Sequence, residues 1–188
     1  GSVQCWGSEG WDWDGGQASD VPIGTFAQVS SGHFHSCAID TNHEIQCWGS
    51  DAEGQITHPS GSFVQISSGE SHSCAIDTEG VGHCWGRDDS GQSTPPDVEF
   101  VQMSAGIYHS CGVDTDNIAY CWGSDSHGEL SGIPDETFTQ VSAGTYHSCG
   151  LTTDQELICW GYSLGGSLNP PTGTFLQVSA GDHFACAI

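Results

Sequence analysis

The sequence Phe138-Thr-Gln-Val-Ser-Ala-Gly144, followed by His147-Ser-Cys-Gly-Leu151 and then by Cys159-Trp-Gly161, contains the pattern that decides the fold. The same order of segments recurs along the chain at intervals of 37 or 38 residues. A fixed period of this length is typical of repeat architectures, in which each unit buries its apolar face against the next. The repeats are marked by five phenylalanines: Phe26, Phe63, Phe100, Phe138 and Phe175.

Each repeat is built from short runs of β-forming residues bounded by Gly, Asp, Asn or Pro, and helical periodicity is missing. Antiparallel units of this kind bury both sheet faces when they stack radially around an axis. We therefore predict an all-β fold, a β-propeller of five blades with one disulfide per blade, in a single domain over residues 1–188. The predicted repeat cores lie near residues 26–49, 63–86, 100–123, 138–161 and 175–188, the last closing with residues 1–7.

The pattern Val-Ser-Ala-Gly-x-Tyr-His-Ser-Cys-Gly-Leu over residues 141–151, a turn, and then Cys-Trp-Gly resembles the repeat of the regulator of chromosome condensation superfamily. The short unit is most similar to the secreted bacterial branch, which includes the β-lactamase inhibitor protein II type. The resemblance implies a propeller. Well-known members have seven blades, so five repeats indicate either a smaller ring or a fragment of a larger array. Guanine-nucleotide exchange and β-lactamase inhibition occur in the family, but neither set of functional residues carries over to this sequence.

Eight of the ten cysteines are spaced so that a hairpin would bring them together in pairs. Folding the segment about Asn42 sets Cys37 opposite Cys47 at the separation of cross-strand neighbours, which is close to disulfide range. An even number of regularly spaced cysteines favours an oxidising compartment over a metal site. The predicted bridges are Cys37–Cys47, Cys74–Cys84, Cys111–Cys121 and Cys149–Cys159.

The first and last cysteines, Cys5 and Cys186, have no partner at this spacing. If the ring closes, we expect them to form the fifth bridge and to lock the first and last strands into one blade. In the alternative, the last strand of one subunit completes a blade of its neighbour, and the bridge joins two subunits of a head-to-tail filament.

The residues that recur in every unit are expected to be structural. The position of His35, His72, His109 and His147 is taken by Phe184 in the fifth unit, which indicates burial rather than catalysis. Nine residues between paired cysteines do not fit the spacing of structural zinc sites. The tryptophans are expected in the core between blades, and the glutamines are expected to bond neighbouring backbone or line the axis: Trp6, Trp48, Trp85, Trp122 and Trp160, and Gln28, Gln65, Gln102, Gln140 and Gln177.

A loop in the first unit departs from the repeat and contains the candidate binding residues. Trp11 and Trp13 are candidates for stacking on a sugar or anchoring a protein partner. Asp12 and Asp14 have the Asp-x-Asp-Gly spacing that can wrap Ca²⁺, and a turn held by Asp side chains is the alternative. Apart from this candidate Ca²⁺, no cofactor is expected.

Carboxylates also recur four residues after the cysteine of Cys-Trp-Gly. If the repeats form a ring, these acids lie on one circle and concentrate negative potential on one face. Solvated loop starts are the alternative interpretation. The residues are Glu9, Asp51, Asp88 and Asp125.

The charge of the chain limits its partners. One Arg and no Lys stand against 24 Asp and Glu, which gives a formal net charge of −23. Such a chain repels phosphate backbones and anionic lipid heads, so we expect neither nucleic acid binding nor membrane association. The longest apolar run, Ile118–Trp122, is far shorter than the roughly 20 residues of a membrane-spanning helix.

Catalysis finds little support, because the chain lacks a phosphate-binding Gly-rich loop followed by Lys and a Gly-x-Ser-x-Gly elbow. We expect a secreted, extracellular, non-catalytic propeller that acts as a protein-interaction or structural module. The alternatives are a subunit of an extracellular head-to-tail filament, which self-associates, and a carbohydrate-binding lectin.

Trypsin provides a test of compactness, because the chain offers one cleavage site, after Arg87. We expect the oxidised protein to keep its native mass during digestion, whereas the reduced and denatured protein is cut after Arg87. Mass spectrometry reads both results. Rapid cleavage of the oxidised protein would contradict a compact fold.

Overall fold

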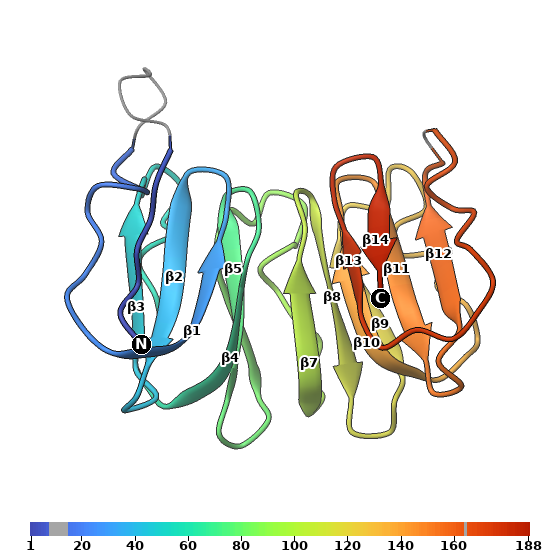
Figure 1. The fold of residues 1–188 in the computed structure, drawn as a ribbon, viewed down its shortest axis with the longest axis horizontal. Coiled ribbons are helices and arrows are strands. Elements are labelled where there is room, and N and C mark those ends of the chain that lie inside the picture. The colour runs from blue at the N-terminus through green and yellow to red at the C-terminus, as the bar shows by residue number, and fades with distance from the viewer. Residues whose placement is uncertain (8–14, 164) are drawn as a thin grey trace.

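A computed structural model describes residues 1–7, 15–163 and 165–188. In this part of the chain, four sheets of three antiparallel strands follow one another, and a fifth sheet has two strands (Figure 1). The strands are β1 (Phe26–Ser31), β2 (His35–Asp40), β3 (Ile45–Gly49), β4 (Phe63–Ser68), β5 (His72–Asp77), β6 (Gly82–Gly86), β7 (Phe100–Ala105), β8 (His109–Asp114), β9 (Ala119–Gly123), β10 (Phe138–Ala143), β11 (His147–Thr152), β12 (Leu157–Gly161), β13 (Val178–Ala180) and β14 (Ala185–Ala187).

The middle strand of each three-stranded sheet pairs with both of its neighbours, and its hairpin places two cysteines opposite each other. In the β2–β3 hairpin Cys37 is the register partner of Cys47, and the four disulfides that form are the four pairs that the sequence spacing predicts. Because each disulfide lies inside one hairpin, none of these four bonds joins two sheets.

The core lies between neighbouring sheets rather than inside any one of them. One cluster joins Cys37 and Ile39 of the first sheet to Phe63, Ile66 and Trp85 of the second. Equivalent clusters join the second sheet to the third and the third to the fourth. A three-stranded sheet therefore buries its apolar residues only when the next repeat is in place.

The inner strands surround a common axis. A hollow of about 230 Å³ on this axis is lined by equivalent residues of all five repeats. The repeat glycine is required here by close approach, because a Cβ at Gly69 would overlap the carbonyl oxygen of Gly106. The same contact links Gly32 to Gly69, Gly106 to Gly144 and Gly144 to Gly181.

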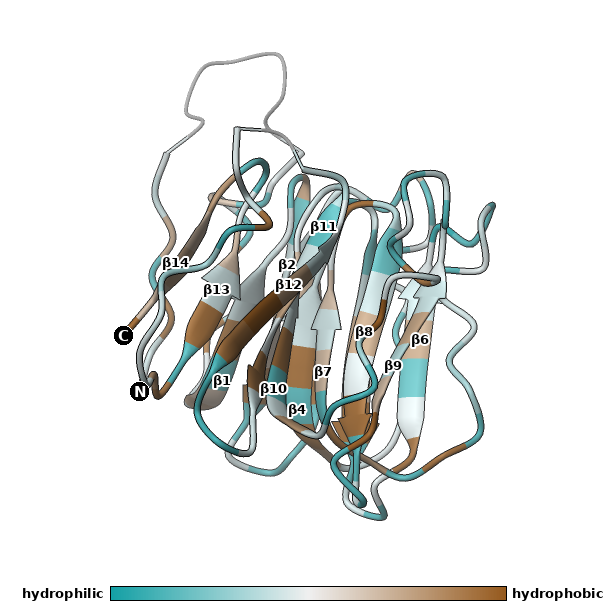
Figure 2. Ribbon diagram, turned by 90° about the vertical axis from the view of Figure 1, so that its right-hand side faces the viewer, coloured by the Kyte–Doolittle hydropathy of each residue, from teal (hydrophilic) through white to brown (hydrophobic). Residues whose placement is uncertain are grey.

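The predicted closed ring of five blades is wrong, because the arc is open between the fifth repeat and the first. A Cβ on Gly181 would meet the ring of Phe184 and not the carbonyl oxygen of Gly32. Val29 of β1 is 49% exposed, whereas its equivalent Ile66 is 2% exposed. Figure 1 shows the two termini at separate ends of the arc, and Figure 2 shows that both lie on the same, open side.

The open arc also corrects the expected bridge within the chain. Cys5 and Cys186 are both free thiols, and they lie at opposite ends of the arc. The angle between successive repeats is set by their packing, and five such steps do not return the last sheet to the first. Among the residues that the structure describes, the fifth sheet consists of β13 and β14 alone.

Removing one disulfide tests how much each hairpin bridge contributes. Replacing both Cys74 and Cys84 with Ala should lower the free energy of unfolding by about 2–3 kcal/mol, because the short cross-linked loop no longer restricts the unfolded chain. Urea unfolding of the oxidised protein measures this loss. The control Val64→Ala changes an exposed side chain on β4 outside the bridge, and an equal loss in that variant would contradict the assignment.

Candidate functional site

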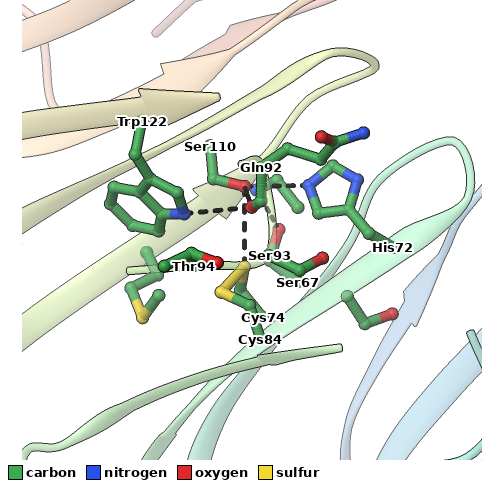
Figure 3. The surroundings of a disulfide bond; sticks show 12 residues. Ser67, His72, Cys74, Cys84, Gln92, Ser93, Thr94, Ser110 and Trp122 are labelled. Atoms are coloured by element: carbon green, nitrogen blue, oxygen red, sulfur yellow. Dashed lines mark hydrogen bonds between the residues drawn. A yellow bond between two sulfur atoms is a disulfide. The ribbon is translucent and has the colours of Figure 1, made fainter. Parts of the chain in front are cut away.

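Three of the four disulfides, at Cys37, Cys74 and Cys111, lie beside a polar network that connects two repeats, and Figure 3 shows the one at Cys74. The hydroxyl Oγ of Ser110 lies 2.8 Å from Nε2 of His72 and 3.5 Å from the sulfur of Cys74, and it donates to the Gln92 carbonyl at 3.0 Å. The Trp122 indole donates to the same carbonyl at 3.0 Å. The network thus ties a histidine and a cysteine of the second repeat to a serine and a tryptophan of the third.

The histidines of this network are neutral because of burial. Desolvation lowers the pKa of His35 and His72 to about 4 and that of His109 to about 3. A neutral ring that bonds a serine could be part of a nucleophilic pair. Here, however, both groups are sealed in the core, with His72 and Ser110 fully buried, so no substrate reaches them. The expectation that these histidines are structural agrees with this geometry.

The fourth histidine marks a break in the pattern. The Nε2 atom of His147 is buried and has no hydrogen-bond partner among the described residues. The reason is in the sequence, because the fifth repeat has Ala185 where the other repeats have serine. The interface between the fourth and fifth repeats therefore lacks the His–Ser bond that the three interfaces before it have.

A glutamine and a serine on each inner strand bond the backbone of the next repeat. The Gln65 amide donates to the Met103 carbonyl at 2.7 Å and accepts from the Met103 amide at 2.8 Å. The Ser67 hydroxyl accepts from the Ala105 amide at 3.0 Å. The same three bonds recur from the first repeat to the second, from the third to the fourth and from the fourth to the fifth.

At the two ends of the arc half of this pattern is missing among the described residues: the last glutamine and serine have no following repeat to bond, and the backbone of β1 has no preceding glutamine and serine to bond it. We call the end formed by residues 1–7 and β1 the first end face, and the end formed by residues 175–188 the last end face. Gln177 and Ser179 of the last end face hold the positions of the bonding glutamine and serine, and both are exposed. On the first end face Trp6 is 86% exposed, whereas the equivalent Trp48 is 4% exposed.

Both end faces are hollowed. A hollow of about 760 Å³ lies between residues 1–7 and β1, and a second hollow of about 250 Å³ lies between β14 and the loop at residues 165–171. None of the described residues that line either hollow is Asp or Glu, although the chain has 24 of them. The two hollows therefore lack acidic side chains in a strongly acidic protein.

The recurring carboxylates hold loops in place. Asp88 accepts from the Ser93 amide at 2.7 Å and from the Thr94 hydroxyl at 2.8 Å, and Asp51 and Asp125 bond their own loops in the same way. Glu9 lies outside the described residues. The interpretation of these acids as loop starts is the one that the geometry supports.

The candidate binding loop cannot be placed. Trp11, Trp13, Asp12 and Asp14 lie outside the described residues, so the predicted sugar, partner and calcium contacts stay predictions. Among the residues that the structure describes, no group of three or more His, Cys, Asp and Glu side chains could hold a metal ion.

An aromatic cluster lies beside the last two complete repeats. The ring of Tyr146 lies 5.6 Å from that of Tyr108 and 4.7 Å from that of His127, between ring centroids. Tyr162 lies 5.2 Å from His127 and is 45% exposed, and His183 lies 6.4 Å from Tyr146. Sequence reasoning missed this cluster, although Tyr108, Tyr146 and His183 share one repeat position. It is the residue directly before the position of His109, His147 and Phe184.

Sequence reasoning also missed the end faces, since it placed Trp6 in the core between blades. Trp6 is exposed because the sheet that would cover it is absent from that end of the arc. The sequence carries no signal of this exposure, because Cys5-Trp6-Gly7 has the same motif as Cys47-Trp48-Gly49.

The structure is thus an open arc of three-stranded, disulfide-bonded sheets around a common axis, which places it among the propeller-type repeat proteins. The Regulator of chromosome condensation (RCC1) repeat matches residues 26–55, 63–92, 100–129 and 138–166. The chain belongs to the RCC1 repeat family. No curated protein sequence matches the chain.

Solved structures agree with the fold. The CRINKLY WD40 ectodomain of the Arabidopsis thaliana receptor kinase ACR4 is 27% identical, with a TM-score of 0.70, over 87% of this chain and 59% of that one. The ectodomain of the Physcomitrella patens receptor kinase CR4 is 30% identical, with a TM-score of 0.73, over 87% and 47%. Yeast RCC1 (Prp20), crystallised with Kap60, is 18% identical with a TM-score of 0.73, over 87% and 54%, and shows the fold alone.

The chain therefore spans roughly half of the length of these relatives. Its four disulfides and its likeness to two receptor ectodomains point to an oxidising compartment. The described residues contain no helix that is long and apolar enough to cross a membrane.

The buried histidines predict a pH dependence of stability. The pKa values of His35, His72 and His109 in the folded protein lie below 6.5. Below this pH these histidines are therefore protonated in the unfolded chain but still neutral in the folded chain. The contribution of these neutral histidines to the free energy of unfolding should be fully present above about pH 6.5 and should be lost as the pH drops toward 4. Urea unfolding at a series of pH values measures this. The variant His72→Phe should show a shallower slope, whereas an unchanged slope would contradict the assignment; the exposed His33→Phe is the control.

Proposed function

We propose that this chain is a non-catalytic interaction module of an extracellular protein. The observation that carries the proposal is the contrast between the interfaces inside the arc, where neighbouring repeats pack and bond each other, and the two end faces, where apolar and hydrogen-bonding groups are exposed. The histidines and serines that could do chemistry are buried and bonded to each other across repeats, as His35 and Ser73 are at 2.8 Å. Apolar and hydrogen-bonding groups are exposed together at the two ends, as Trp6, Leu176 and Phe184 are. Exposed apolar surface of this kind marks interaction sites.

Secretion is part of the same proposal. Disulfides within four successive repeats persist where the surroundings are oxidising, and the receptor ectodomains that resemble this chain are the outer parts of their proteins by description. The similarity of the short repeat to the secreted β-lactamase inhibitor branch rests on the sequence pattern and supports the same conclusion. A net charge of −23 favours protein partners over nucleic acids and membranes.

Carbohydrate binding is a second candidate, and the aromatic cluster around Tyr146 favours it. Tyr108, Tyr146 and His183 form a nearly parallel series of rings, with interplanar angles of 26° and 13°. Faces of aromatic rings bind the apolar faces of sugars. Sugar binding by this cluster is compatible with protein binding at the end faces, because the two sites share His183 and otherwise consist of different residues.

The proposal is tested by measuring binding and turnover on the same oxidised protein. Sedimentation velocity over a range of concentrations reads self-association, a glycan array reads sugar binding, and a panel of ester, glycoside, phosphate and peptide substrates reads catalysis. We expect binding without turnover. Turnover that His72→Phe abolishes would overturn the non-catalytic assignment, and the absence of any binding would overturn the interaction module. Tyr146→Ala should remove glycan binding, with Tyr120→Ala as the matched control.

A further inference from the structure

We propose that the partner of the first end face is the last hairpin of a second copy of this chain, residues 175–188, which enters the hollow between residues 1–7 and β1. This inference rests on the proposed function and names the partner of that module. The hairpin and residues 1–7 would then form one complete three-stranded blade, joined by a disulfide between Cys186 of one copy and Cys5 of the other.

Residues 1–7 already occupy the position of a third strand. In every interface between repeats, the amide of the repeat phenylalanine donates to a carbonyl in the turn of the preceding repeat, as Phe63 does to His43 at 2.8 Å. Phe26 makes this bond to the carbonyl of Gly1, also at 2.8 Å. Residues 1–7 therefore pack against β1 as the outer edge of a preceding blade, and the hollow of about 760 Å³ is the space of that blade's two inner strands.

The last hairpin provides the two strands that would fill this space. Strands β13 and β14 are two inner strands without an outer one. In the complete sheets Cys37 pairs with Cys47 and Ser36 pairs with Trp48. The same register sets Cys186 opposite Cys5 and Ala185 opposite Trp6.

The hydrogen-bonding groups of the two end faces are complementary. The repeat pattern assigns the side chain of Gln177 to the backbone of Val29, as Gln65 bonds Met103, and assigns the hydroxyl of Ser179 to the amide of Ser31. Gln177, Val29, Ser179 and Ser31 are all exposed in the single chain. The contact would reproduce the bonds that hold the other interfaces, with the exception of the His–Ser bond, because Phe184 stands in the histidine position.

Apolar burial favours the same contact. Trp6 is 86% exposed and Val29 is 49% exposed, whereas Trp85 and Ile66, their equivalents in the second repeat, are 8% and 2% exposed. The repeat phenylalanine packs against the tryptophan of its own sheet, as Phe100 does against Trp122 at 5.6 Å between ring centroids. Phe175 lacks this tryptophan, and Trp6 of the second copy supplies it by entering the hollow of about 250 Å³ beside β14.

The distribution of charge permits a second copy of this chain to bind at the first end face. Two molecules with a net charge of −23 repel each other except where carboxylates are absent. The described residues that line the two hollows include no Asp or Glu, and residues 175–188 contain Asp182 as their only acid. Added salt should strengthen the contact, because it screens the repulsion between the remaining surfaces.

The connection before the hairpin allows a second copy to approach. Gly165, Gly166 and Gly173 have positive φ values of 65°, 90° and 145°, and most of the described residues from 165 to 174 are exposed or half-buried. The exposed connection therefore leaves the edge of β14 open to a second copy, while β13 keeps its bonds to β10. Because the two end faces differ, the contact is heterologous, and it closes a ring or continues as a filament according to the angle between copies.

The covalent step is a thiol–disulfide exchange that needs a small-molecule disulfide as oxidant. One glutathione disulfide accepts the two electrons of the Cys5 and Cys186 thiols. The S–S bond of glutathione breaks, the bond between Cys5 and Cys186 forms, and the two protons remain on the two glutathione thiols that are released.

Two single variants test the contact, because neither can form the bridge alone. The variants Cys5→Ser and Cys186→Ser are mixed in a glutathione redox buffer, and the products are separated by non-reducing electrophoresis and mapped by mass spectrometry. We expect a heterodimer that carries the Cys5–Cys186 peptide, and a ladder from the unmodified chain. A monomer that carries this peptide from the unmodified chain would overturn the proposal in favour of ring closure, and a mixture without the peptide would overturn it outright.

A matched pair of substitutions tests the docking surface without relying on the thiols. Val29→Asp buries a carboxylate in the contact and should lower the heterodimer yield about tenfold. Val64→Asp is the control, because Val64 is 53% exposed on a neighbouring strand outside both end faces. Equal yields from the two variants would overturn the contact. If the unmodified protein still associates in sedimentation while the bridge fails to form, the interaction module stands and this partner is wrong.

Discussion

The constraint on which the rest of the structure depends is that no repeat can satisfy itself. A single three-stranded sheet exposes an apolar face on each side. Its first strand carries a glutamine and a serine, and its second strand a histidine, that bond the next repeat, as Gln28, Ser30 and His35 do. Ile66 reaches 2% exposure, for example, because Cys37 and Ile39 of the preceding sheet cover it. Stability therefore comes from the interfaces, and it is transmitted along the chain from neighbour to neighbour.

This constraint explains how the disulfides and the histidines divide the structural roles. The disulfides join strands within a sheet and restrict each hairpin, while the His–Ser bonds join one sheet to the next. The two devices meet at the serine hydroxyl, which lies near both the histidine ring and the cysteine sulfur, as Ser110 does. A buried neutral histidine is well suited to this task, because it can bond a hydroxyl on one side without introducing a charge into the core.

The sequence was sufficient for the parts of the fold that recur. The period, the three strands of each unit and the cysteine pairs follow from spacing alone, because alternation and hairpin geometry are local properties. The closure of the ring did not follow, since the angle between repeats depends on the packing of side chains such as Phe63, Ile66 and Trp85 and has no signature in the spacing. Trp6 shows the limit clearly: its motif is the same as that of Trp48, but its surroundings are different. The candidate binding loop with Trp11 and Trp13 has no repeat to guide its placement.

The position of the disulfides has a consequence for how such a chain can change in evolution. Each bridge closes inside a single hairpin, so a whole repeat carries both of its cysteines with it. A gene that duplicates or loses a unit from one phenylalanine to the next therefore leaves no odd thiol behind. Repeat number is free to vary by recombination, whereas a scaffold whose bridges crossed between units would be locked to one length.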